Sequence, residues 1–225
     1  MALLDFARGT GMRIALALFV FGVLWRLVSL LLLRTRRDLS EPRRRSWTGL
    51  RLIVTRMWPR QQFGAAWLDV ANSYVLHIGF ALLLLFYAPH ALFFRNLLGG
   101  LVPASLSEHL DWPALPTGVI SITAALTLAA ALIALMQRLA HPVRRLLSNF
   151  DDYASLLLTA LPIATGLMAF MHVGGIRYEH LLALHLLTVE AFIAWFPWGK
   201  LTHAITVFAS RGVTGLRLER KGAAL

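Results

Sequence analysis

Long apolar runs alternate along the chain with short segments that are rich in arginine. The first run, from Gly11 to Leu33, is longer than the roughly 20 residues that a transmembrane helix needs. Four more apolar runs follow, over residues 69–94, 117–136, 153–172 and 181–207. This pattern predicts an all-α membrane protein, in which residues 1–225 form a single integral membrane domain with five transmembrane helices.

The arginines predict how this bundle sits in the membrane. Nine arginines lie between Arg34 and Arg60, against only two acidic residues. Such an excess beside a span marks the cytoplasmic side, so we expect the basic loop 34–68 in the cytoplasm, the N-terminus outside and the C-terminus inside. No signal-peptide cleavage site follows the first run, which indicates a retained span in a bacterial inner (cytoplasmic) membrane. Within the loop, Trp47–Trp58 is either an interfacial amphipathic helix or a solvated segment.

The composition narrows the possible chemistry. Hydrophobic residues make up 58% of the chain, and the mean hydropathy is +0.66. The absence of cysteine excludes thiolate-ligated iron–sulfur clusters within this chain, so any electrons must be carried by histidine-ligated haem or a bound quinone. The net charge of +11 comes from loop arginines and reflects topology rather than nucleic-acid binding.

Two histidines mark the fifth run. As a continuous helix it would place His185 and His203 about five turns and ~27 Å apart on one face, near opposite membrane surfaces. A neutral imidazole in a membrane helix is a natural axial ligand of haem iron. The helix could therefore supply one ligand to each of two haems.

The second run carries the matching pair, His77 and His90. The second and fifth spans are antiparallel, so His77 pairs with His203 near the inside and His90 with His185 near the outside. Their spacing puts His77 and His90 on nearly opposite faces of an ideal helix, unless Pro89 kinks or ends it. Gly79 beside His77 leaves room for a flat macrocycle.

The other histidines are alternatives to this set. His172 and His180 lie near the same outer surface as His90 and are the substitutes for it as the fourth ligand, while His141 and His109 are expected to face solvent. A single membrane histidine can also be a hydrogen-bonded packing residue.

Further polar residues are expected at defined places. Arg26 lies deep in the first span, where it either snorkels or meets a haem propionate or Glu190. Asp151 and Asp152 fit a helix N-terminal cap better than a catalytic pair. Pro162 and Gly166 predict a kink or a close helix crossing in the fourth span.

The runs LHIGFALLLLFYAPH and ALHLLTVEAFIAWFPWGKLTHAI, with the five-span layout, resemble the γ subunit of respiratory nitrate reductase and its dihaem cytochrome b relatives. The resemblance implies a quinol-oxidising membrane subunit that passes electrons inward through two b haems to a cytoplasmic partner. By position, His185 and His203 match the ligands of the fifth helix and His77 the inner ligand of the second. His90 follows His77 at a longer interval than in the nitrate reductase pattern.

The resemblance gives a specific expectation. A quinol from the quinone pool is oxidised near the outer haem iron of His90 and His185, and the inner haem iron of His77 and His203 serves a cytoplasmic iron–sulfur or molybdenum oxidoreductase subunit. Arg95 and Arg177 contact a propionate or the quinone, or anchor the chain at the interface. The rivals are a haem-free membrane anchor or small proton or ion transporter, and a protein with one haem. The reverse electron flow, quinone reduction, stays open.

Overall fold

The computed structural model describes residues 2–32, 47–55, 66–100 and 112–222, and no strand occurs among them. The longer helices are α2 (Met12–Leu32), α3 (Trp67–Phe86), α4 (Ala88–Gly99), α6 (Thr117–Ala140), α8 (Phe150–Met171), α9 (Tyr178–Trp195) and α10 (His203–Arg220). The shorter helical pieces are α1 (Ala2–Phe6), the π-helical η1 (Ala7–Gly11), α7 (Pro142–Leu147), and the 3-10 turns η2 (Thr48–Ile53), η3 (Val173–Gly175) and η4 (Lys200–Thr202).

Several of these helices are long and apolar enough to cross a membrane. They are the continuous segment Ala2–Leu32, α3, α6 and α8, and the bent pair of α9 and Lys200–Arg220 is a further candidate. Large apolar side chains on them are exposed, such as Leu31 (84%) and Ile122 (64%), as expected for surfaces that lipid covers. The described parts of the chain thus form an all-helical membrane protein with four or five candidate spans.

The bounds of the first, third and fourth spans differ from the apolar runs. Helix α6 covers the predicted span 117–136 and extends to Ala140, and α8 begins before the predicted span 153–172 and ends at Met171, one residue short of it. The predicted start of the first span at Gly11 is wrong, because α1, η1 and α2 follow one another without a break from Ala2. The π-helical turn η1 lies where the apolar run was expected to begin.

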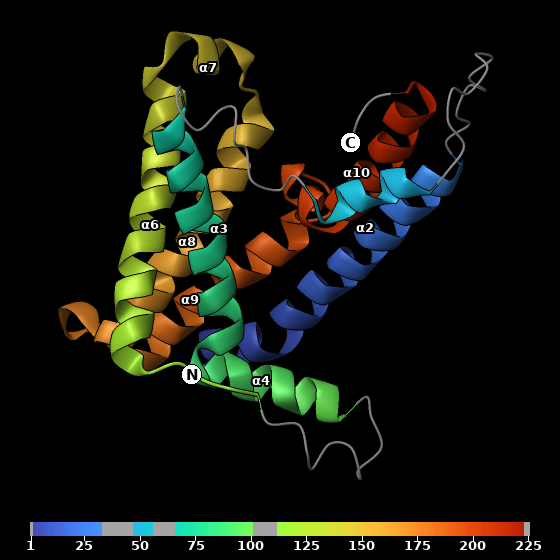
Figure 1. The fold of residues 1–225 in the computed structure, drawn as a ribbon. Helices are drawn as coiled ribbons and strands as arrows, with labels where there is room; N and C mark the ends of the chain where they lie inside the picture. Colours follow the sequence, from blue (N-terminus) through green and yellow to red (C-terminus); the bar gives the residue numbers. More distant parts are fainter. Residues whose placement is uncertain (1, 33–46, 56–65, 101–111, 223–225) are drawn as a thin grey trace.

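The helices pack in a row: α3 on α6, α6 on α8, α8 on α9, and α9 on α2 (Figure 1). Helices α3 and α6 come very close at Gly79, where an added Cβ would lie 1.9 Å from the hydroxyl oxygen of the buried Thr127. The expectation that Gly79 makes room for a macrocycle is therefore wrong, because this glycine faces α6.

The second apolar run is broken in two, so the single span predicted over 69–94 is wrong. Helix α3 ends at Phe86, Tyr87 is extended (φ −73°, ψ 129°), and α4 begins at Ala88 with Pro89 in its first turn. Proline is favoured there because it has no N–H and its φ suits a helix start. Pro89 was predicted to kink or end the helix; the helix instead ends at Phe86, before Pro89, and α4 runs across the axis of α3 (Figure 1).

The fifth apolar run is also broken. Helix α9 ends at Trp195, and α10 begins at His203 after a bend of 76°. The expectation of one continuous helix over 181–207 is therefore wrong, and His185 and His203 lie on different helices. We call the connecting residues 196–202 the α9–α10 junction.

Polar groups hold the α9–α10 junction from two sides. Thr202 Oγ1 donates within the junction and lies 2.7 Å from the carbonyl oxygen of Gly199. From α2, Arg26 donates through Nε to the Pro197 carbonyl and through Nη2 to the Trp198 carbonyl, both at 3.0 Å. Arg26 therefore binds carbonyl groups that the end of α9 leaves without helical partners.

The N-terminus of α8 is capped as predicted. Asn149 Oδ1 accepts from the Asp152 N–H at 3.3 Å, and Asp152 Oδ2 accepts from the Asn149 N–H at 3.0 Å. The two form a capping box that satisfies backbone donors at the helix start. The Asp151 and Asp152 carboxylates also bind Lys200 in the α9–α10 junction.

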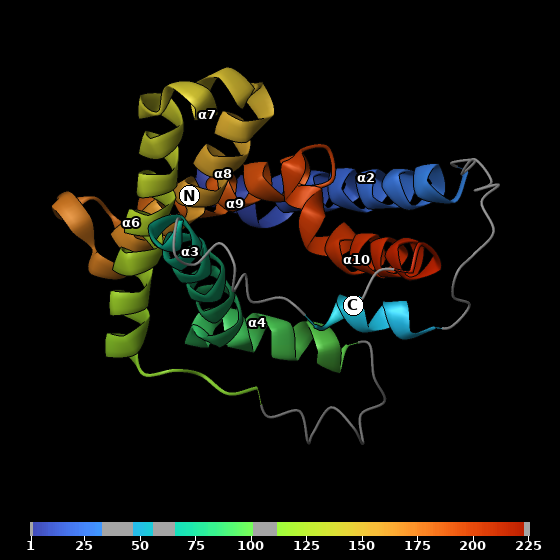
Figure 2. The same ribbon diagram turned by 45° about the horizontal axis from the view of Figure 1, so that its top comes forward.

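Part of the basic loop packs on the C-terminal helix. Within the predicted interfacial segment Trp47–Trp58, the described residues form η2, which lies beside α10 (Figure 2). Gly49 N donates to Glu219 Oε2 at 2.9 Å, and Arg211 Nε donates to the Leu52 carbonyl at 2.9 Å. Residues 34–46 and 56–65 of the predicted basic loop 34–68 lie outside the described residues, as does His109.

Candidate functional site

His77 and His203 lie next to each other, on α3 and at the first residue of α10. Their ring centroids are 6.0 Å apart, and the ring planes stand at 73°. Both residues are exposed, so their imidazoles are accessible between the two helices. The structure thus brings together the two residues that were predicted to form the inner pair.

His90 and His185 form a second pair, between α4 and α9. Their ring centroids are 6.2 Å apart and the planes are nearly parallel, at 13°. The break at Tyr87 makes this possible, since it frees His90 from the helical register of His77. On one ideal helix His77 and His90 would face nearly opposite directions. The interruption of the helix at Tyr87, rather than a kink, removes this difficulty.

The ring nitrogens of these histidines are oriented by backbone carbonyls. Such a hydrogen bond joins His77 Nδ1 to Ser73 O (2.7 Å), His203 Nδ1 to Lys200 O (2.7 Å) and His90 Nδ1 to Leu83 O (2.9 Å). A carbonyl oxygen only accepts, so Nδ1 carries the proton and Nε2 keeps its lone pair. This is the arrangement that metal-binding histidines use.

The His185 ring packs against helix α8. Thr165 Oγ1 lies 3.4 Å from His185 Nδ1 and 2.8 Å from Thr188 Oγ1. A Cβ added at Gly166 would lie 3.0 Å from the Cε1 atom of His185, so the ring packs directly on this glycine and would have to shift for a side chain there. The close helix crossing predicted at Gly166 is confirmed by this contact with α9, whereas Thr165 and the identity of His185 as the partner of Gly166 were not predicted.

Aromatic side chains fill the space between the two histidine pairs. Phe80 of α3 meets Phe192 of α9 with ring centroids 5.5 Å apart, and Phe192 lies 5.8 Å from Phe196. Among the described residues, no extended backbone packing joins α3 to α9. The rings of Phe80 and Phe192 therefore make the contact between these two helices, and the two imidazole pairs join α3 to α10 and α4 to α9.

The residues present fit a haem group with two axial histidines. An imidazole nitrogen coordinates a transition metal at about 2 Å, so imidazoles on opposite sides of one metal ion have ring centres roughly 6 Å apart. Both pairs have this separation. No group of three or more His, Cys, Asp or Glu side chains that could hold a metal occurs in the described parts of the chain. A haem needs only two protein ligands, because the porphyrin supplies the rest.

The remaining predicted contacts lie elsewhere. Arg95 is exposed on α4, and Arg177 is exposed at the start of α9, where its Nε donates to Glu179 Oε2 at 3.3 Å. Arg26 binds the α9–α10 junction, so its predicted contact with Glu190 is wrong. A role for any of these arginines toward a propionate or a quinone stays a prediction.

The substitute histidines stand apart from the pairs. The His172 ring stacks on Tyr178, with ring centroids 5.3 Å apart. His180 is exposed on the first turn of α9, and His141 is exposed between α6 and α7, as predicted. It is His90 that faces His185.

Glu190 is a buried carboxyl group on α9. It is 7% exposed, and an added Cβ at Gly11 of η1 would lie 2.5 Å from its Oε2. Its Oε1 has no hydrogen-bond partner among the described residues. Such a group inside a membrane helix marks a possible functional site.

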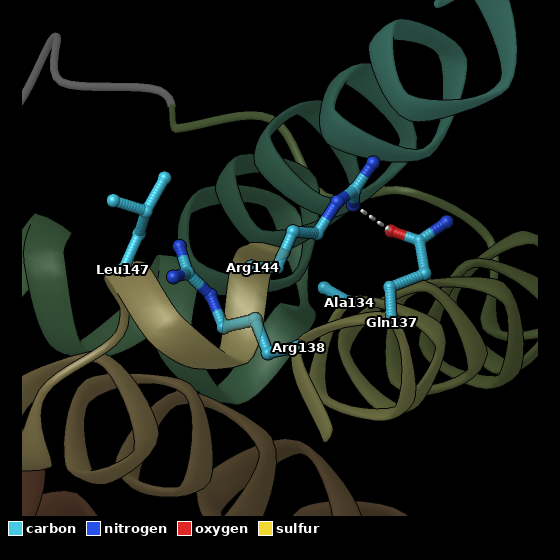
Figure 3. Close-up of a pocket in the computed structure, with 5 residues that line it drawn as sticks. All are labelled: Ala134, Gln137, Arg138, Arg144 and Leu147. Atoms are coloured by element: carbon cyan, nitrogen blue, oxygen red, sulfur yellow. Dashed lines mark hydrogen bonds between the residues drawn. The ribbon is translucent and has the colours of Figure 1, made fainter. Parts of the chain in front are cut away.

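A pocket of about 310 Å³ lies at the end of α6, lined by Ala134, Gln137, Arg138, Arg144 and Leu147 (Figure 3). Both arginines already bind acidic partners: Arg138 lies 3.0 Å from Asp152, and Arg144 pairs with Asp69. Arg144 also donates to Gln137 at 2.8 Å. The contacts of Arg144 hold α7 against α3 and α6, and the pair of Arg138 with Asp152 joins α6 to α8. The arginines of this pocket therefore link helices.

The fold and the paired histidines define a multi-pass, all-helical membrane protein with two bis-histidine arrangements. The chain is 32% identical over 171 residues to a protein of Nitratidesulfovibrio vulgaris (strain Hildenborough), a match that covers 75% of this chain and 68% of the relative. The chain belongs to the family of that protein, whose name states no activity. No family model and no solved structure matches the chain.

Proposed function

We propose that the chain is a dihaem cytochrome b subunit of a membrane oxidoreductase, which takes electrons from a quinol and delivers them to a redox partner in the cytoplasm. The observation that carries the proposal is the two imidazole pairs with ring centroids 6.0 and 6.2 Å apart. In three of the four histidines, Nδ1 is hydrogen-bonded to a carbonyl, which leaves Nε2 free for a metal.

His77 and His203 would hold one haem b, and His90 and His185 the other. When bound, a b haem supplies a one-electron redox centre. Ser73, Lys200 and Leu83 fix the ring tautomers through their carbonyls, and Gly166 leaves room for the His185 ring. Phe80 and Phe192 would place apolar rings beside the two haems.

The charges of the loops indicate how the chain is oriented in the membrane and therefore in which direction electrons would pass. We place the arginine-rich segments in the cytoplasm of a bacterial inner membrane, which puts His77 and His203 at the cytoplasmic side and His90 and His185 at the outer side. A quinol would bind near the outer pair, where Arg95 and Arg177 are exposed. The partner would be an iron–sulfur or molybdenum subunit, which the basic loop and the C-terminal arginines can meet alongside membrane lipid.

Spectra of three purified proteins test the assignment. The wild-type chain should give a reduced-minus-oxidised b-type spectrum, and His185→Ala and His203→Ala should each lose about half of it because each removes a ligand of a different haem. His141→Ala is the matched control, since this exposed histidine belongs to neither pair. An unchanged spectrum in both ligand variants would refute the assignment.

One observation favours the second candidate, a haem-free membrane anchor or a proton or ion transporter. Glu190 is a buried carboxyl group in an apolar span, and proton pathways use such groups. Haem absorbance and proton flux, measured in proteoliposomes that contain either the wild-type protein or Glu190→Gln, decide between the two candidates. A colourless wild type whose proton flux is lost in the variant supports transport, while a haem-loaded wild type without flux supports the cytochrome.

A further inference from the structure

The position of the His203 ring depends on the α9–α10 junction. His203 Nδ1 and the Lys200 carbonyl oxygen are 2.7 Å apart, and Lys200 begins the turn η4 that leads directly into α10. Any shift of the Lys200 backbone therefore changes the hydrogen bond that orients this imidazole.

The N-terminus of α8 holds the same lysine. Asp151 Oδ2 accepts from the backbone N–H of Lys200 at 2.8 Å, and Asp151 Oδ1 accepts from Trp195 Nε1 at 3.2 Å. Asp152 Oδ2 accepts from Lys200 Nζ at 2.5 Å, and its Oδ1 lies 3.0 Å from Arg138. The Asp152 side chain is 4% exposed, whereas the Lys200 side chain is 51% exposed, so the ion pair joins a buried carboxylate to a lysine that reaches the surface.

Gly199 allows this approach. A Cβ at Gly199 would lie 2.4 Å from Trp195 Nε1 and 2.5 Å from Asp151 Oδ1. A side chain there would separate the Asp151 carboxylate from the indole. The contact between α8 and the α9–α10 junction thus depends on a glycine next to Lys200.

We propose that Asp151 and Asp152 are positioning residues for the haem of His77 and His203. By holding Lys200 from α8, they fix the direction of the His203 ring and the strength of its hydrogen bond. The proposal rests on the proposed function, because it assumes that His203 is a haem ligand. A firm hydrogen bond to Nδ1 makes an imidazole more basic, and a more basic ligand favours the oxidised iron.

The test measures the two haems separately in the purified protein. The Asp151 carboxylate accepts from three donors, the Ser155 hydroxyl, Trp195 Nε1 and the Lys200 N–H. Asp151→Asn has only one carbonyl oxygen for them, so the Lys200 backbone loosens. We expect a higher reduction potential and a shifted EPR signal for the haem of His77 and His203. The EPR signal is sensitive because the angle between the imidazole planes, 73° for this pair, governs the spectrum of a low-spin haem. The haem of His90 and His185 should keep its signal, which reports that the variant is folded.

A second variant separates geometry from charge. Removing the negative charge of Asp151 could by itself raise the potential, whereas Gly199→Ala changes no charge and displaces the same contact. We expect the same shifts of potential and EPR signal in Gly199→Ala. Glu179→Gln is the matched control, because it changes a carboxylate to an amide at the far end of α9, where Glu179 pairs with Arg177.

The outcomes are distinguishable. A wild-type protein without haem overturns the proposed function and this proposal with it. Two haems in the wild type, with both variants as unchanged as Glu179→Gln, overturn only the positioning role. A shift in Asp151→Asn that Gly199→Ala does not share also overturns it, because the effect is then one of charge alone.

Discussion

The His90 ring lies 6.2 Å from the His185 ring and nearly parallel to it. An interruption of the helix at Tyr87 separates His90 on α4 from His77 on α3. This break lets one apolar run contribute a histidine to each of two pairs. The proposal of two haems follows from this geometry together with the His77–His203 pair.

Replacing His90 should remove one haem. In His90→Ala the His185 imidazole has lost the ring that faces it, so about half of the b-type absorbance should disappear. His172→Ala should keep the full absorbance, because its ring stacks on Tyr178 instead. Optical titration of each variant with haem measures the absorbance. Full absorbance in His90→Ala with a loss of half in His172→Ala would make His172 the fourth ligand.

Filling the space at Gly166 should disturb one pair only. An added Cβ lies 3.0 Å from His185, so Gly166→Val should displace the ring and lower the haem content of the His90–His185 pair. The other pair should keep its EPR signal. Gly118→Val is the matched control, since nothing lies within 4 Å of a Cβ at Gly118. Equal spectra for both glycine variants would contradict the packing of His185 on α8.

Gly79 should matter for stability rather than for cofactor geometry. In Gly79→Ala the new Cβ overlaps Thr127 Oγ1, and we expect a loss of roughly 1–3 kcal/mol in the free energy of unfolding. Adding Thr127→Ala removes the overlapping hydroxyl and should restore part of the loss. Thermal unfolding in detergent measures both, and a single variant as stable as the wild type would show that α3 and α6 are not in close contact.

Arg26 should stabilise the α9–α10 junction. The shorter amide of Arg26→Gln cannot replace the planar guanidinium that donates to both the Pro197 and Trp198 carbonyls. Loss of these hydrogen bonds should lower the free energy of unfolding by about 1–3 kcal/mol. Arg13→Gln, at the exposed far end of α2, is the control and should unfold like the wild type. If both variants unfold alike, the contact of α2 with the junction contributes nothing.

The sequence was sufficient to predict that the protein is helical and which histidines lie opposite each other. Apolar runs predict α6 and α8 because their length and composition leave few alternatives. The pairing of His77 with His203 and of His90 with His185 needed only the antiparallel order of two spans, and the structure places these rings together.

The bend in the fifth run could not be predicted from periodicity. The run stays apolar through Phe196, Pro197 and Trp198, so hydropathy continues across the break. Proline and glycine near its end were a signal of a helix stop. The bend itself is held by Arg26 and Asp151, which are distant in sequence, and the face of Gly79 likewise depends on which helix packs against it.

The haem content of the purified wild-type chain tests the central claim most directly. A pyridine haemochrome assay, set against protein concentration, should give two b haems per chain, one for each histidine pair. A colourless protein, prepared from cells supplied with haem, would contradict the account, and a value of one would leave one of the pairs without a cofactor role.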